Sequence, residues 1–263
     1  MVSRLLVLSS ATVIVSSVAL AGNTETAADS ARSAEAIRTA GEALSRALEY
    51  TGFDKLRTFR MAASADDMAQ RTTMIDSTTP FLSEHINGRP AWRVEFPGVV
   101  LDLDWASPEY EAQYPKNVVV LIDSSSGQLL EIRATAEGLG AEHLPAEATA
   151  EEAERQLRGM ASEFYSGFPA DRPSMTFVDA LNKNIGGSVL KAKLIVAQYL
   201  LYSRDNASWK PAWVIHLHGI PAYARDYVTQ MRTVIDAQTG KSITAANVPH
   251  PPSDSLKLDK DSR

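Results

Sequence analysis

Two histidines, His216 and His218, come closest in this chain to the type and spacing of a reactive site. They alternate within a strand-like segment, so both imidazoles are expected on one face of a strand, about 7 Å apart along it. That spacing could hold a metal ion if a third ligand came from elsewhere, which makes a metal-assisted hydrolase one hypothesis. The sequence identifies no third ligand. Two solvent-exposed histidines are the simpler expectation, so we predict no catalytic residue, metal or cofactor.

Acidic side chains gather between residues 94 and 115, a segment without Lys or Arg. Asp102 and Asp104 are expected on one face of a strand, where paired carboxylates can run acid–base chemistry or hold calcium. Apolar residues interrupt the acids, and the glycine bend of calcium loops is missing, so a solvated acidic surface is the expectation. Such a surface would attract a basic partner. The acids of this segment are Glu95, Asp102, Asp104, Glu109 and Glu111.

Three aromatic residues, Trp105, Tyr110 and Tyr114, fall in the same segment. Aromatic side chains in a polar loop serve as binding anchors, and they also plug the edges of domains. Together with Asp102 and Asp104 they are our candidate binding residues.

Several kinds of chemistry are excluded by what the sequence lacks. The chain has no cysteine, so neither a thiol mechanism nor a disulfide framework is available. Neither Gly-x-Ser-x-Gly nor His-Glu-x-x-His occurs. The formal net charge is −6 and no basic stripe is present, which argues against nucleic acid as a partner.

The sequence elements that would position these residues occur twice in the chain. Pro-Ala-Trp begins a strand-like run at residue 90 and again at residue 211. Side chains alternate along a strand, so Trp92 and Trp213 each head an apolar face opposite a more polar one. This pattern predicts antiparallel sheets that are covered on one side. The two apolar faces are Trp92, Val94, Phe96 and Trp213, Ile215, Leu217.

A hairpin signature follows each of these strands. Asp123 and Gly127, and later Asp236 and Gly240, stand at the two ends of Ile-Asp-x-x-x-Gly. The aspartate can accept hydrogen bonds from the amides ahead of it, and glycine tolerates a positive φ. We therefore interpret both aspartates as turn residues and not as ligands or acids.

A helix is expected ahead of each sheet. Residues 33–50 carry an apolar stripe, and residues 149–164 begin with the capping box Thr149-Ala-Glu-Glu152. A third echo, Tyr50-Thr-Gly-Phe53 and Tyr165-Ser-Gly-Phe168, places the ends of these helices at matching points. Residues 189–202 are expected to form a strand.

A helix, a Pro-Ala-Trp strand and a strand that ends in Ile-Asp-x-x-x-Gly together resemble the PepSY domain. The matching residues are Pro90, Ala91, Trp92, Val94, Ile122, Asp123 and Gly127, then Pro211, Ala212, Trp213, Ile215, Ile235, Asp236 and Gly240. The resemblance implies two tandem α+β units, each an amphipathic helix on an antiparallel sheet. PepSY-like domains occur in propeptides of secreted thermolysin-like metallopeptidases, which they inhibit, and as freestanding exported modules. Because no zinc-peptidase motif follows here, the resemblance implies that any inhibition acts in trans.

The whole chain divides accordingly. Arg4, an apolar run and Ala19-Leu20-Ala21 predict a signal peptide over residues 1–21, with export to the periplasm or beyond and no membrane insertion after cleavage. A flexible leader (22–32), a first unit (33–133), a linker (134–148), a second unit (149–248) and a disordered tail (249–263) follow. The expected function is a non-enzymatic binding module for a secreted peptidase or a peptide. A metal-assisted hydrolase and a scaffold without outside ligand are the alternatives.

The signal-peptide interpretation predicts that exported protein begins at Gly22. N-terminal sequencing of the protein recovered from a bacterial periplasm should read Gly-Asn-Thr-Glu. A chain that keeps Met1 and stays with the membrane fraction would contradict this.

Overall fold

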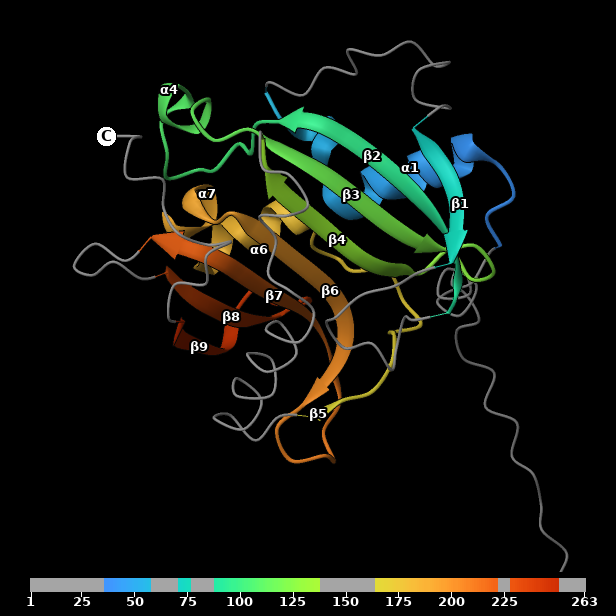
Figure 1. The fold of residues 1–263 in the computed structure, drawn as a ribbon. Helices are drawn as coiled ribbons and strands as arrows, with labels where there is room; N and C mark the ends of the chain where they lie inside the picture. The colour runs from blue at the N-terminus through green and yellow to red at the C-terminus, as the bar shows by residue number, and fades with distance from the viewer. Residues whose placement is uncertain (1–35, 58–70, 77–87, 138–163, 222–227, 251–263) are drawn as a thin grey trace, which may run out of the picture. The chain divides into compact units, whose positions relative to one another are not determined.

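The chain folds into one antiparallel sheet with short helices packed against it, as the computed structural model shows (Figure 1). The structure describes residues 36–57, 71–76, 88–137, 164–221 and 228–250. The sheet has the order β1-β2-β3-β4-β6-β7-β8-β9, and β5 pairs with β6. The predicted α+β class and the predicted antiparallel sheet are confirmed.

We call residues 36–137 the first half and residues 164–250 the second half. The elements of the first half are α1 (Ala40–Thr51), η1 (Phe53–Lys55), β1 (Thr72–Asp76), β2 (Pro90–Val99), α4 (Pro108–Glu111), β3 (Lys116–Asp123) and β4 (Leu129–Ala136). Those of the second half are β5 (Phe164–Tyr165), α6 (Phe177–Asn184), α7 (Ser188–Lys191), β6 (Leu194–Ser203), β7 (Lys210–Pro221), β8 (Val228–Asp236) and β9 (Ser242–His250). Thus β4 runs past residue 134, where we expected a linker, and β9 includes the first two residues of the expected tail.

The helix α1 begins at a capping box and ends at a glycine. Thr39 accepts a hydrogen bond from the Glu42 amide, and the Glu42 carboxylate accepts one from the Thr39 amide. Gly52 ends the helix at φ 75°, and a Cβ there would clash with Thr176, the N-cap of α6. The chain therefore needs glycine at this position for the backbone conformation and for the close approach of the two helices.

Both Pro-Ala-Trp strands are tied to their helices by the same hydrogen bond. The indole of Trp92 donates to the Ile37 carbonyl (3.0 Å), just before α1, and the indole of Trp213 donates to the Met175 carbonyl (2.9 Å), just before α6. Each strand then carries a β-bulge with a glycine at positive φ, Gly98 (63°) and Gly219 (66°). The two halves thus build the same helix-on-sheet connection.

The two hairpins also share their hydrogen bonds. Asp123 accepts bonds from the amides of the second and third residues after it at 2.8 and 3.1 Å, and Asp236 does the same at 3.0 and 2.9 Å. In both hairpins the glycine amide donates to the aspartate carbonyl at 2.8 Å. These are the turn roles that the sequence indicates for both residues.

The helix that takes the place of α1 in the second half is α6, and the predicted helix over residues 149–164 stays a prediction. The capped helix that receives the second Trp bond is α6, which starts after Thr176, whereas our predicted helix over residues 149–164 lies almost entirely outside the described residues. Phe164, placed on that helix by its apolar pattern, belongs to the strand β5. The tyrosine of the repeated Tyr-x-Gly-Phe motif therefore lies at the end of a helix in the first half and in a strand in the second. This short match does not mark equivalent positions in the two halves. The predicted strand over 189–202 starts later, because Val189 and Leu190 belong to α7.

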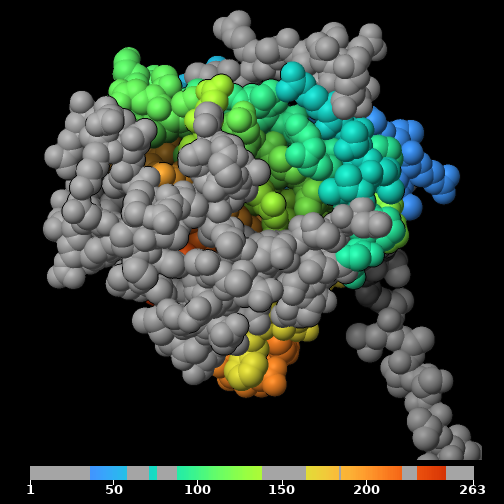
Figure 2. Space-filling view, viewed as in Figure 1, coloured from blue at the N-terminus to red at the C-terminus, as the bar shows by residue number. Residues whose placement is uncertain are grey.

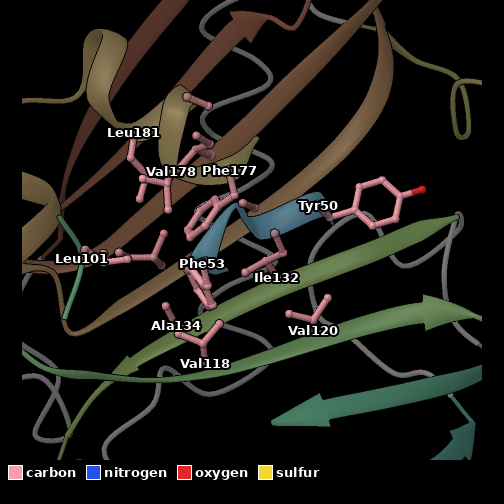
Figure 3. Packing of buried hydrophobic residues seen from close by; sticks show 14 of the residues in the cluster. Tyr50, Phe53, Leu101, Val118, Val120, Ile132, Ala134, Phe177, Val178 and Leu181 are labelled. Atoms are coloured by element: carbon pink, nitrogen blue, oxygen red, sulfur yellow. The ribbon is translucent and has the colours of Figure 1, made fainter. Parts of the chain in front are cut away.

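The two halves share one core on the helix-bearing face of the sheet. Phe53 of η1 meets Phe96 edge-on, with ring centroids 5.4 Å apart, and Phe177 of α6 lies 6.3 Å from the Trp213 ring. Figure 3 shows Phe53 and Phe177 side by side above the strands that carry Val118 and Ile132. Pairing of β4 with β6 carries the sheet from one half into the other, so the core is continuous. Among the helices that the structure describes, none has the length and apolar character needed to cross a membrane.

The shared Trp contact predicts unequal costs for two matched substitutions. Trp213 is fully buried, whereas Trp92 is partly exposed. We expect Trp213→Phe to lower the free energy of unfolding by about 3 kcal/mol, because it leaves a cavity and an unpaired carbonyl, and Trp92→Phe to lower it by about 1 kcal/mol. Urea denaturation of both variants measures the difference. Equal losses would contradict the burial difference.

Candidate functional site

His216 and His218 lie on β7 and are buried, each with 1% of its surface exposed. Our prediction that they face solvent was therefore wrong. The alternation was interpreted correctly, since both project from the face opposite Trp213, but that face is also buried in the second half. A polar residue pattern identifies the face of a strand, while exposure depends on what packs over it.

The two imidazoles are not arranged to share a metal ion. Their rings are nearly parallel, at 11°, with centroids 6.1 Å apart. Two imidazole ligands of one tetrahedral zinc need nitrogens about 3.3 Å apart and rings that converge on the ion. Within the residues that the structure describes, no group of three His, Asp or Glu side chains could hold a metal. The described geometry gives the hydrolase hypothesis no support.

The histidines belong to a belt of buried polar side chains that runs across three neighbouring strands. It consists of Gln198 on β6, His216 and His218 on β7, and Gln230 and Arg232 on β8. The Arg232 guanidinium donates to the Tyr165 hydroxyl at 3.1 Å. This bond joins β8 to β5.

On the same face of the first half, Arg93, Glu95 and Arg133 are partly exposed, whereas Glu131 is buried. Arg93 pairs with Glu95 on β2, and Arg133 donates to the buried Glu131 carboxylate on β4 at 2.6 and 3.0 Å. Figure 2 shows teal and green atoms of the first half at this surface. The two halves therefore share a backbone plan but differ in how their second face is covered.

The acidic segment contains no Lys or Arg, and the cation that pairs with its carboxylates is Arg57, from an earlier part of the chain. Arg57 pairs with Asp102 and donates to Glu111 at 3.1 Å. The other Glu111 oxygen accepts the Leu103 amide at 2.6 Å, and the Glu111 side chain is buried. The hydrogen bond from Arg57 holds the pKa of Asp102 below its usual value. Asp102 and Asp104 do not share a strand face, because β2 ends at Val99. The expected free acidic surface is thus in part an internal ion-pair network.

The three aromatic candidates separate in the structure. Trp105 is 41% exposed, and its ring lies within 4 Å of the position that a Gly187 Cβ would occupy. Tyr110 and Tyr114 pack edge-on against each other at 5.3 Å and against the core. Asp104 joins this segment to α6, because its amide donates to the Asn182 side chain at 2.8 Å. Of the three aromatics, Trp105 alone is exposed.

Sequence analysis missed Lys116, a fully buried lysine at the start of β3. Its ammonium donates to the carbonyls of Leu190 and Ala192 at 2.8 and 2.6 Å, at the end of α7. Burial lowers its pKa from 10.5 to about 8. A lysine beside an apolar strand is ordinary in sequence, so only the fold could identify this link between the halves.

A second missed feature lies at the edge of the sheet. We call Met74 on β1 and its cross-strand neighbour Trp92 on β2 the edge patch. Met74 is 49% exposed and Trp92 is partly exposed. In the second half the matching pair is Tyr199 and Trp213, with ring centroids 5.6 Å apart and both side chains buried. The first half leaves open an apolar position that the second half closes.

A pocket along α1 has charged walls that are already paired. Glu49 bonds Arg172 at 2.6 Å and lies 3.4 Å from Arg46, while Glu42 accepts the amides of Arg38 and Thr39. These charges serve the helix and its capping, so the pocket offers little to a charged ligand.

Comparison of the chain with protein-family models, curated proteins and solved structures gives no match.

The lowered pKa of Lys116 predicts a pH dependence of stability. Its folded value lies below its unfolded value, so the unfolded chain binds more protons between pH 8 and 10.5. Relative to Lys116→Met, the wild type should gain stability as pH rises through this range, by up to about 1.4 kcal/mol per pH unit. Urea denaturation at several pH values measures this gain. Lys210→Met, at an exposed lysine, is the control, and a flat difference between wild type and Lys116→Met would contradict the burial of charge.

Proposed function

We propose that this protein is an exported, non-enzymatic binding protein made of two tandem PepSY-like units. Its partner is an extended peptide segment, either free or part of a secreted peptidase that it inhibits in trans. The proposal places the mature chain in the periplasm or outside the cell.

Support for two related units comes from contacts that recur at matching positions. The indole-to-carbonyl bond, the bulge glycine and the Asp-to-Gly turn each appear once per half, in the same order. Hydrogen bonds of this kind depend on side-chain type and backbone register together. Three coincidences in one order are hard to obtain from unrelated folds.

The observation that carries the binding role is the difference between Trp92 and Trp213. Both indoles make the same hydrogen bond, yet Trp213 is fully buried beside Tyr199 while Trp92 lies beside the exposed Met74. An exposed methionine on an edge strand, next to a partly exposed tryptophan, offers side chains that favour contact with a partner. A fold that needed these residues for stability alone would have closed both positions.

A scaffold without outside ligand is the second candidate, because several contacts join the halves. Lys116 caps α7, Asp104 bonds Asn182, and β4 pairs with β6. These contacts make the two halves one body, which a scaffold requires. They leave the edge patch unexplained.

Binding assays against secreted metallopeptidases from the same cell envelope test the proposal. We expect the mature chain to bind one of them, or a peptide, saturably by calorimetry, and to lower peptidase activity in a dose-dependent way when a peptidase is bound. Trp105→Ala and Met74→Ala locate the contact, since these two exposed side chains stand on different elements. Absence of any saturable partner would contradict the proposal and favour the scaffold.

A further inference from the structure

We infer that Trp105 and the unpaired carboxylates beside it, Asp104 and Glu109, form a docking site for an Arg- or Lys-bearing segment of a partner. The cationic side chain of that segment lies on the indole ring. This inference rests on the proposed binding function, and it names the chemistry of the partner at a contact separate from the edge patch.

Trp105 lies in a segment that the shared helix-on-sheet plan does not require. The stretch from Trp92 to Asp123 is eight residues longer than the stretch from Trp213 to Asp236. The second half pairs β7 with β8 in the same way as β2 pairs with β3, without the extra length. The added segment is therefore available for a task other than building the hairpin.

The segment is held in place by residues other than its tryptophan. Leu101 and Leu103 are fully buried in the core, and the Asp104 amide donates to the Asn182 side chain at 2.8 Å. One edge of the Trp105 ring, at Cζ3 and Cη2, lies 3.9 and 4.0 Å from the position that a Gly187 Cβ would occupy. Trp105 nevertheless remains 41% exposed, so part of its ring is open to a partner.

The carboxylates of this segment outnumber the cation that pairs with them. Arg57 pairs with Asp102 and Glu111, and its pKa is raised by the hydrogen bond with Asp102 and further by the charge of Asp104. The pKa of Glu109 is lowered by hydrogen bonds within its own turn and further by the charge of Arg57. All four carboxylates thus lie within range of one guanidinium, and together these five groups carry a formal charge of −3.

Asp104 and Glu109 are the carboxylates of this group that have no counter-ion. Both are exposed, and among the residues that the structure describes no Lys or Arg forms an ion pair with either. The Lys183 side chain, close by in sequence to the α6 end of this junction, lies instead against Gly240, with its Cγ 3.5 Å from the position of a Gly240 Cβ. A cation from a partner would therefore meet uncompensated negative charge.

An exposed indole in surroundings of this sign favours a cationic side chain. A guanidinium or ammonium on the face of a tryptophan gains about 0.5–1 kcal/mol at an exposed site. Carboxylates beside the ring add charge-assisted hydrogen bonds, which for arginine are often bidentate. An anionic segment would be repelled, and a neutral apolar segment would leave both carboxylates unused.

A second copy of this chain fits the site poorly. The chain has a formal net charge of −6, and no two Lys or Arg residues are adjacent in its sequence. Two copies therefore repel each other at long range, and neither offers a strongly basic segment. A partner of opposite charge is the occupant that the charges favour.

A short labelled peptide in which Arg and Gly alternate tests the inference on the full mature chain. We expect saturable binding by fluorescence anisotropy, which weakens as salt is added because exposed charges are screened. The same peptide with citrulline, the neutral analogue of arginine, should bind at least about fivefold more weakly. Equal binding of the two peptides would overturn the inference.

Matched variants locate the contact. Trp105→Leu keeps an apolar side chain without the aromatic face and should weaken binding about fivefold. Asp104→Asn and Glu109→Gln remove charge with little change of shape, and each should weaken it about threefold. Trp209→Leu and Asp171→Asn, at exposed positions outside the segment, are the controls and should leave the affinity unchanged. Denaturation midpoints near that of wild type establish that each variant is folded.

Nuclear magnetic resonance gives a readout at the ring itself. The indole N–H signal of Trp105 is assigned by its loss in Trp105→Leu. It should shift as the Arg peptide is added, while the signal of the buried Trp213 stays in place. A titration that leaves the Trp105 signal unmoved would contradict the inference.

Other outcomes separate the site from the proposed function. Equal weakening by Asp171→Asn would show a general attraction to an acidic chain and overturn the site. Self-association of the wild type that Trp105→Leu abolishes would identify a second copy as the occupant and overturn it as well. A captured peptidase whose affinity is unaffected by Trp105→Leu would sink the Trp105 site and leave the proposed function standing. Arg-peptide binding at Trp105 without any envelope partner would contradict the proposed function, and the cation site would stand.

Discussion

The structure depends on one recurring contact, the hydrogen bond from a tryptophan indole on the sheet to a backbone carbonyl just before a helix. The ring fills the space between helix and sheet, while its N–H fixes where the helix starts. A capping box follows each of these carbonyls, at Thr39 and at Thr176. Helix position, strand register and core packing are thus set together, and the rest of each half is built around that point.

The two halves use this contact in different surroundings. In the second half, Tyr199 and Phe177 pack against the fully buried Trp213, and polar residues on the opposite face are buried as well. In the first half, Trp92 stands near an edge strand, and the opposite face is partly open. The same helix-on-sheet connection is thus closed in the second half and partly accessible in the first, which is the asymmetry that the proposed binding function uses.

Charged groups that the sequence analysis had assigned to the surface or overlooked organise the first half and its connection to the second. Arg57 neutralises Asp102 and Glu111, and Lys116 caps the end of α7. Paired or hydrogen-bonded charges can be buried, whereas isolated ones cannot. The acidic segment is therefore organised from within at Asp102 and Glu111, while Asp104, Trp105 and Glu109 remain exposed.

Local sequence patterns predicted the α+β class, the Pro-Ala-Trp strands and the two Asp-to-Gly turns, because each depends on residues close together in the chain. The same reasoning failed for Phe164 and for the exposure of the histidines. A two-residue strand and a helix can share an apolar pattern, and burial depends on distant segments. Alignment of the helices failed for a related reason, since the spacing between helix and strand differs between the halves.

By itself, then, the sequence determined the alternating faces, the hairpin turns and the repetition of a short strand motif, since backbone geometry and side-chain type act within a few residues. Only the tertiary structure decided that both halves join in one sheet, that α6 is the helix paired with Trp213, and that Met74 lies at an edge. Which strand neighbours which, and which face is covered, are set by packing free energy summed over the whole chain. No local pattern carries that information.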